Sequence, residues 1–270
     1  SNPPGVLFTA NGNNPIIISS GSIEALAGSF SIQANDSITI NSALNLANLN
    51  ANNRTGTFET TTGDITIITG SNISTGNNGN LQFTAGGSIH VSAAVGSAGT
   101  GTLTLQAGGA GAINANAGAA FNALTFIQFG GTLALTGNTT LTSGTVFLQN
   151  VTGAGLDLTV DGTAQISGNV AVNALSVINN GATKLVGTTP QVTTAGNQNY
   201  TGTFSLQGTG VTGTLTSTAG SISFGSSISI GANSLTIASS AGLTIPSTTG
   251  GGGSLTINNG AGSVTFNSTV

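Results

Sequence analysis

Short runs of alternating apolar and polar residues recur along the whole chain, and Gly, Asn, Ser and Thr separate them. Leu103 and Leu105 flank Thr104, and Val264 and Phe266 flank a threonine in the same way. Because successive side chains of a β-strand point to opposite faces, the pattern predicts strands that bury these apolar residues and expose the threonines. Gly and Asn suit the corners between strands, since Gly takes positive φ freely and Asn tolerates it.

The runs return at an interval of about 20 to 23 residues, which lies in the range of solenoid repeats. Phe58, Leu81 and Leu103 occupy equivalent places in the blocks GTFETTTGDITI, GNLQFTAGGSIHV and GTLTLQAGGAGAI. Leu235 and Leu255 do the same in NSLTIASSAGLTI and GSLTINNGAGSVTF. Equivalent apolar positions recur after a whole turn of the coil, whereas in a β-hairpin they would recur after a two-residue loop. This favours coils stacked in parallel, with about 12 or 13 turns in the chain.

We expect one continuous β-solenoid over residues 1–270. Residues 1–15 fit the template less well and contain Pro3, Pro4 and Pro15, which predicts an amino-terminal extension or partial cap. Residues 253–270 follow the template to the end and contain no charged residue and no Pro. This predicts an open coil edge, covered by more of the same polypeptide or by the amino-terminal region of the next subunit.

Stacking is needed because one coil cannot stabilise itself. Burying an apolar side chain contributes about 1.5–3 kcal/mol, whereas fixing each backbone residue costs about 1–2 kcal/mol. The inward positions of the template form the predicted core, which comprises Phe58, Leu81, Phe83, Leu103, Leu105, Phe147, Leu215, Phe224, Leu235, Ile237, Leu255, Ile257, Val264 and Phe266.

Composition supports an all-β fold and excludes several partners. Charged residues make up 3% of the chain and Cys is absent, so neither a disulfide framework nor a thiolate site exists. With Arg54 and Lys184 as the basic residues and a net charge of −4, the chain is unsuited to binding nucleic acid or anionic membranes. No stretch approaches the roughly 18 apolar residues of a membrane helix, so membrane insertion is not expected.

The segments QVTTAGNQNYTGTFSLQGTG, from Gln191, and GSLTINNGAGSVTFNSTV, from Gly253, resemble repeats of very large bacterial proteins of the filamentous-haemagglutinin family. The resemblance lies in the general residue pattern of the repeats and covers most of the chain. It implies a right-handed parallel β-helix that is exported unfolded to the bacterial cell surface, where such proteins act as adhesins, fibres or sheath-like layers. The family's amino-terminal secretion domain is not recognised, which implies an interior or polymer-forming segment.

The six acids of the chain are candidate catalysts, because β-helices host many polysaccharide-cleaving enzymes. Asp157 and Asp161 are expected about 13 Å apart on an outward strand face, whereas glycosidase carboxylates lie about 5 to 9.5 Å apart. Glu59 and Asp64 border a turn and are the better catalytic or calcium candidate, although a calcium site needs six to eight oxygens. We expect all four to be solvated surface acids.

The remaining candidates also favour structural roles. His90 is the single His and is expected outward on a strand, where neither a Ser-His-Asp triad nor a His-based metal site has support. Tyr200 is expected to cover a coil or rim, with stacking on glycans as the alternative. Thr-x-Thr pairs suggest an ice-binding array, but Asn80, Thr145 and Ser234 interrupt it. Asn-x-Ser/Thr sequons, for example at Asn72 and Asn150, imply glycosylation only in a eukaryotic secretory setting.

The sequence therefore predicts a non-enzymatic building block of a secreted extracellular or cell-surface fibre that stacks end to end. The alternative is an adhesin segment that binds glycans or surfaces through its side loops, and a polysaccharide-cleaving β-helix enzyme ranks third. No catalytic residue, metal site or cofactor is expected. The expected partners are further copies of the chain or its own continuation, with glycans or cell surfaces under the adhesin hypothesis.

Overall fold

The structure, a computed structural model, describes residues 6–10, 18–76, 78–97, 99 and 101–267. The chain is all-β, and its parallel stacked coils form a β-solenoid of about 10 turns. The all-β fold and the parallel stacking are thus confirmed, with fewer turns than the expected total of about 12 or 13. Two compact units, Ser1–Gly137 (unit 1) and Asn138–Val270 (unit 2), are described separately, and the single continuous solenoid stays a prediction.

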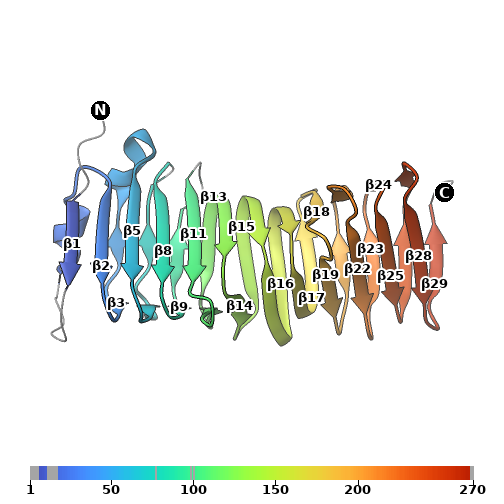
Figure 1. Cartoon of the computed structure of the whole chain (residues 1–270), viewed down its shortest axis with the longest axis horizontal. Helices are drawn as coiled ribbons and strands as arrows, with labels where there is room; N and C mark the ends of the chain where they lie inside the picture. The colour runs from blue at the N-terminus through green and yellow to red at the C-terminus, as the bar shows by residue number, and fades with distance from the viewer. Residues whose placement is uncertain (1–5, 11–17, 77, 98, 100, 268–270) are drawn as a thin grey trace. The chain divides into compact units, whose positions relative to one another are not determined.

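The described elements of unit 1 are, in chain order, β1 (Val6–Ala10), α1 (Ser20–Glu24), β2 (Phe30–Ala34), β3 (Ile38–Ile40), β4 (Leu44–Asn45), the 3-10 helix η1 (Ala47–Asn53), β5 (Thr55–Thr60), β6 (Ile65–Ile67), β7 (Ile73–Ser74), β8 (Asn80–Ala85), β9 (Ile89–Val91), β10 (Ala94–Gly96), β11 (Thr102–Ala107), β12 (Ala112–Ala115), β13 (Ala120–Phe129) and β14 (Thr132–Leu135). Strands β1 to β12 form three parallel ladders, β1-β2-β5-β8-β11, β3-β6-β9-β12 and β4-β7-β10, the first of which can be followed in Figure 1. The next strand, β13, pairs with both β10 and β11, and β14 pairs with β12. A coil such as β5-β6-β7 therefore has three strands, including the third strand expected around Ile73.

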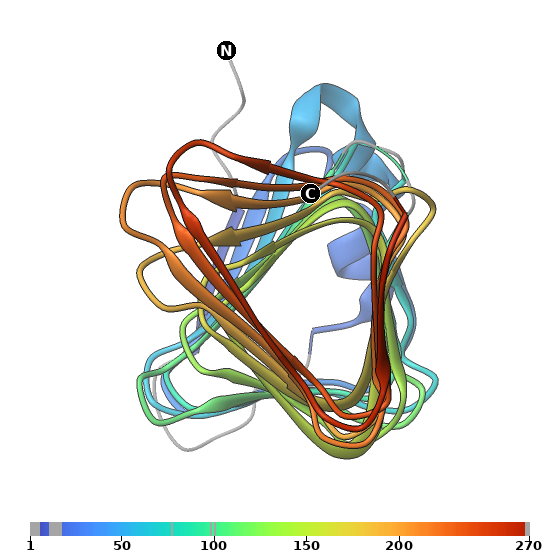
Figure 2. The ribbon, with the colours of Figure 1, turned by 90° about the vertical axis from the view of Figure 1, so that its right-hand side faces the viewer.

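The described elements of unit 2 are, in chain order, β15 (Thr139–Leu148), β16 (Asn150–Ile166), β17 (Asn169–Ile178), β18 (Thr183–Val186), β19 (Gln191–Thr194), β20 (Gln198–Tyr200), β21 (Phe204–Gln207), β22 (Thr212–Ser217), β23 (Ser221–Phe224), β24 (Ile228–Gly231), β25 (Ser234–Ser239), β26 (Gly242–Ile245), β27 (Thr248–Gly250), β28 (Ser254–Asn259) and β29 (Ser263–Phe266). Its ladders are β17-β19-β22-β25-β28, β17-β20-β23-β26-β29 and β16-β18-β21-β24-β27. Seen along the stack, the coils of unit 2, from yellow to red, follow three-sided paths around a shared interior (Figure 2).

Coil length varies more than the expected 20 to 23 residues. Leu44 lies opposite Ile73, 29 positions later, whereas Leu158 lies opposite Leu175, 17 positions later. The long coils of unit 1 contain insertions such as η1, and the short coil of unit 2 accompanies a register shift after Gly153. Because the early coils are longer than the sequence period, the chain completes fewer turns.

Of the predicted extension over residues 1–15, the structure describes only β1, which pairs in parallel with β2; the rest lies outside the described residues. Helix α1 follows and was not expected. Its Glu24 accepts a hydrogen bond from Asn45 N at its Oε1 atom and another from Asn48 Nδ2 at its carbonyl oxygen, both at 2.7 Å. Glu24 therefore ties α1 to the start of the third strand ladder.

Most residues of the predicted core are 0 to 3% exposed, namely Phe58, Leu81, Phe83, Leu103, Leu105, Leu215, Phe224, Leu235 and Ile237. Phe147 is an error of the sequence analysis, because it is half-buried between fully buried Val146 and Leu148. A register shift between Thr142 and Thr145, where β15 pairs with β16, moves the inward positions from odd-numbered to even-numbered residues. A bulge of this kind re-aims every following side chain.

The last four predicted core residues are also not fully buried. Leu255 and Ile257 are half-buried, and Val264 and Phe266 are 36% and 42% exposed. They continue the buried rows of β25 and β26 in register. Their outer edge, however, pairs with no other strand among the described residues, so each lacks packing on one side.

Buried hydroxyl groups fix several corners of the coils. In unit 2, Ser217 Oγ donates to Gly196 O of the preceding coil at 2.7 Å and accepts from Gly220 N of its own corner at 3.0 Å. Ser239 Oγ likewise lies 2.7 Å from Gly242 O, to which it donates, and 3.2 Å from Gly220 O of the preceding coil. A Ser or Thr followed at a short interval by Gly is therefore a corner signal, which strand alternation alone did not show.

Close stacking predicts that Gly101→Ala is destabilising. A Cβ atom at Gly101 would lie 2.0 Å from Gly79 O of the preceding coil, so the backbone would have to move. We expect a loss of about 1–3 kcal/mol in the free energy of unfolding, measured by urea denaturation. Gly109→Ala is the matched control, because its Cβ would meet nothing within 4 Å and should change stability by less than about 0.5 kcal/mol. Equal losses in both variants would contradict the stacking distance.

Candidate functional site

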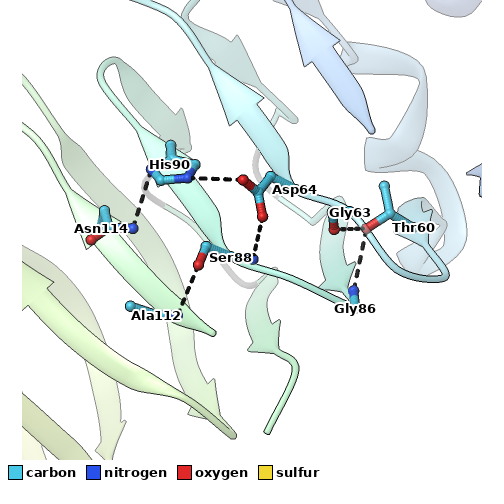
Figure 3. Close-up of polar contacts among 8 residues, drawn as sticks. All are labelled: Thr60, Gly63, Asp64, Gly86, Ser88, His90, Ala112 and Asn114. Atoms are coloured by element: carbon cyan, nitrogen blue, oxygen red, sulfur yellow. Dashed lines mark hydrogen bonds and ion pairs between the residues drawn. The ribbon is translucent and has the colours of Figure 1, made fainter. Parts of the chain in front are cut away.

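The His90 ladder, made of Asp64, Ser88, His90 and Asn114, is the group in unit 1 that brings together an acid and the single His (Figure 3). Asp64 precedes β6, His90 lies in β9 and Asn114 lies in β12. Parallel pairing places Thr66, His90 and Asn114 opposite one another on three successive coils. The ladder therefore runs across the coils on the outward face of this sheet.

Both carboxylate oxygens of Asp64 and both ring nitrogens of His90 have partners. Asp64 Oδ1 accepts from Ser88 N at 2.7 Å, and Asp64 Oδ2 lies 3.4 Å from His90 Nε2. Asn114 Nδ2 lies 3.1 Å from His90 Nδ1. When the amide donates to Nδ1, the imidazole carries its proton on Nε2 and directs it at Asp64. The side chains of His90 and Asp64 are 36% and 50% exposed, so water screens this pair.

The contacts of the His90 ladder join neighbouring coils, and their geometry differs from that of a catalytic triad. A general base needs a ring nitrogen directed at the nucleophile, but both nitrogens of His90 contact other groups. Ser88 Oγ accepts from Ala112 N at 3.1 Å, which fastens the next coil. Among the residues that the structure describes, no group of three or more His, Cys, Asp or Glu side chains gathers around a metal position.

The other acids paired in the sequence analysis have separate partners. Glu59 Oε2 accepts from Gln33 Nε2 of the preceding coil at 2.9 Å, while Asp64 belongs to the His90 ladder. In unit 2, Asp157 Oδ1 accepts from Asn173 Nδ2 at 2.7 Å. A further hydrogen bond joins Asp161 to Asn179 in the same way. These carboxylates act as acceptors between chain segments of neighbouring coils.

The asparagines of the two sequons also accept hydrogen bonds from neighbouring coils. Asn72 Oδ1 accepts from Ala94 N at 3.0 Å, and Asn150 Oδ1 accepts from Asn169 N at 3.1 Å. Each side chain thus binds a backbone N–H of the next coil, a role that the sequence analysis missed. The recurrence of Asn, Asp or Ser just before or at the start of a strand was the available signal, since these side chains readily accept from nearby backbone N–H groups.

Tyr200 does not lie at a rim. It is 0% exposed inside unit 2, and its hydroxyl donates to Gln198 Oε1 at 2.9 Å. Burial raises the pKa of the Tyr200 hydroxyl far above its ordinary value, because the phenolate would lose its water. An interior tyrosine cannot stack on a glycan, so that alternative for Tyr200 is wrong.

The outward threonines of unit 2 form interrupted rows. Thr214, Thr236 and Thr256 lie opposite one another on β22, β25 and β28. The row that contains Thr216 continues through Ala238 and Asn258, and the row that contains Thr212 continues through Ser234 and Ser254. The expected interruption of the Thr-x-Thr array is therefore present on this sheet.

Exposed apolar side chains in unit 1 are a second surface feature. Phe129 is 54% exposed and Leu124 is 44% exposed, both on β13. Gln128, directly before Phe129 in the chain, is 1% exposed instead and donates to Gly131 O at 3.1 Å. β13 therefore buries an amide and exposes an aromatic ring, which reverses the usual preference.

Substitution of His90 tests how much the contacts of the His90 ladder contribute to stability. We expect His90→Ala to lower the free energy of unfolding by less than about 1 kcal/mol, since the pair with Asp64 is exposed to water. Asp64→Ala should cost more, because it also removes the acceptor of Ser88 N. Urea denaturation of both variants measures which of them loses more free energy of unfolding. A larger loss for His90→Ala would mean that the imidazole has a stronger role than these contacts indicate.

In the part of the chain that the structure covers, no helix has the length and apolar character needed to cross a membrane. Comparison with protein-family profiles, with curated proteins and with solved structures finds no significant match, so the stacked coils and their polar ladders are the observations from which a function is inferred.

Proposed function

We propose that this chain is a non-enzymatic structural segment of a secreted fibre, located outside the cell or on its surface, of the filamentous-haemagglutinin-like kind in bacteria. The observation that carries the proposal is the in-register parallel stacking of coils within each unit. In such a stack every coil is stabilised by its neighbours, so the structure suits a stiff extended element. The resemblance of the sequence repeats to surface proteins of that family supports the cellular location.

The use of the acids supports a structural role. Glu24, Glu59, Asp64 and Asp157 each accept a hydrogen bond from a residue of another coil. Side chains that hold coils together contribute to the stability of the stacked coils within each unit, and this role requires no bound cofactor. Under this proposal the polysaccharide-cleaving function ranks last.

Assembly in the proposed fibre uses the edge of the last described coil. β28 and β29 extend the ladders of β25 and β26 in register and carry the partly exposed Leu255, Ile257, Val264 and Phe266. An unpaired strand edge is a template for another strand. The proposal assigns this edge to a further solenoid coil, supplied by more of the same polypeptide or by the next subunit.

Electron microscopy and sedimentation of the purified native material test the fibre proposal. Elongated particles whose length grows with concentration are the expected result. A stable monomer of 26.0 kDa that does not change on dilution, with no axial contact between particles, would overturn it. Labelling of intact source cells with an antibody against the chain tests the location, and a signal that appears only after permeabilisation would contradict it.

An adhesin segment is the second candidate, and the exposed aromatic ring of Phe129 favours it. Phe129 lies opposite Gln106, and Ile127 lies opposite Thr104, so an apolar ring adjoins polar side chains on one sheet face. Binding of the chain to a panel of immobilised neutral glycans tests this function. Loss of binding in Phe129→Ser, with unchanged binding in Leu124→Ser, would support it, whereas no binding by the unmodified chain would exclude it for that panel.

A further inference from the structure

The Tyr200 cluster, made of Thr194, Gln198, Tyr200, Phe204 and Phe224, lies in the interior of unit 2. Its members are 0 to 3% exposed. The ring of Tyr200 is stacked on that of Phe224 at a centroid distance of 5.3 Å and meets Phe204 edge-on at 5.1 Å. Phe204 and Phe224 are 5.2 Å apart, so the three rings contact one another mutually across two coils.

The polar atoms of the Tyr200 cluster are paired as well. Tyr200 donates to Gln198 Oε1 at 2.9 Å. Gln198 Nε2 donates to Thr216 O at 2.8 Å and lies 3.3 Å from both Thr194 Oγ1 and Val192 O. Thr216 belongs to β22, in the coil after Gln198. The buried amide therefore links two coils, and in a dry interior such hydrogen bonds are strong when every group is satisfied.

Neighbouring positions in the same rows are mostly aliphatic. Gln198 lies opposite Leu175 on one side and Ile222 on the other. Tyr200 lies opposite Val177 and Phe224. Aromatic rings bury more area than aliphatic side chains and gain about 0.5–1.5 kcal/mol from ring contacts. The interface between the coil of β19–β21 and the coil of β22–β24 thus combines ring contacts with a satisfied polar network.

Unequal interfaces have a kinetic and thermodynamic consequence in a stack of coils. Stability there is approximately the sum of coil terms and neighbour interfaces, and folding spreads from the place where it starts. We propose that the Tyr200 cluster is the folding nucleus of unit 2, the part that orders first and opens last, and that the coil of β28 and β29 orders last. This inference concerns the folding order of a single, unstacked chain, whose β28–β29 edge is uncovered, so it is tested on dilute chain before any stacking into the proposed fibre.

Hydrogen exchange of the full 270-residue chain, followed by mass spectrometry, tests the order in two ways. In the native protein, peptides that contain β20 and β23 should keep their amide protons at least about tenfold longer than peptides that contain β28 and β29. In pulse-labelled refolding, the same two strands should become protected first. Earlier protection of any other strand of unit 2, or equal native protection throughout, would overturn the proposal.

Two phenylalanines provide a matched pair of variants. Phe224→Leu removes a ring of the Tyr200 cluster and should shorten protection across β19–β24 by at least about tenfold. Phe266→Leu makes the same chemical change on β29 and should affect only β26 and β29. A smaller effect for Phe224→Leu than for Phe266→Leu would contradict the inference. If Phe224→Leu does not fold, the measurements on the unmodified chain still decide the question.

Discussion

Leu105→Asp is expected to unfold unit 1, with a loss of about 3–5 kcal/mol in the free energy of unfolding. Leu105 is 0% exposed and lies between Phe83 and Gln128 of the adjoining coils. A carboxylate there would be removed from water with no cation to pair with it. Because coils stabilise each other, the damage should extend to the neighbouring coils of unit 1.

Thr104→Asp is the matched control, one residue earlier on the same strand. Thr104 is half-buried on the outward face, opposite Gln82 and Ile127. An aspartate at this position keeps contact with water, so we expect a change of no more than about 1 kcal/mol. Circular dichroism during urea denaturation measures both variants. Equal losses would show that the inward and outward faces of β11 have been assigned wrongly.

The contrast between Leu105 and Thr104 was predictable because it depends only on the two-residue period of a strand. Local alternation also located Phe58, Leu81 and Leu235 correctly inside. Alternation fails where a strand changes register. At Phe147 the shift between the paired strands reverses inside and outside, and Gly144, inside the strand at the shift, was the available signal of a bulge.

The candidate site was less predictable, because it depends on which residues of different coils lie opposite one another. Asp64 and His90 are 26 positions apart, and they meet only because the coil between them has the required length. Coil length varies along unit 1, for example through the insertion of η1 in the coil before Asp64, and the repeat template does not contain such changes. The single residues were recognised as candidates, but their pairing required the structure.

The interior of unit 2 departs from the simple rule that apolar residues are inside. Gln198 is 0% exposed, in a row whose other members include Leu175 and Ile222. A buried amide becomes acceptable only when its partners are present, here the hydroxyl of Tyr200 and the carbonyl oxygen of Thr216. Those partners come from another strand position and another coil, so the local pattern around Gln198 could not show them.

Alkaline pH is expected to unfold unit 2 through Tyr200. The hydroxyl of Tyr200 has a raised pKa in the folded chain because burial disfavours the phenolate. In the unfolded chain the pKa is about 10. A group whose folded pKa is raised contributes its stability fully below the unfolded pKa and loses it as the pH rises above that value. Stability should therefore fall steadily with increasing pH above about 10.

Tyr200 is the single tyrosine, so its ultraviolet absorbance reports its ionisation directly. We expect the phenolate signal to appear together with the loss of β-sheet circular dichroism, because the group ionises only when unit 2 opens. Tyr200→Phe should abolish the part of the alkaline destabilisation that this hydroxyl causes. At neutral pH the variant should be less stable by about 1–3 kcal/mol, because Gln198 Oε1 loses its donor. Phenolate formation near pH 10 in a chain that keeps its β-sheet signal would show that Tyr200 is accessible to water and that its burial is wrong.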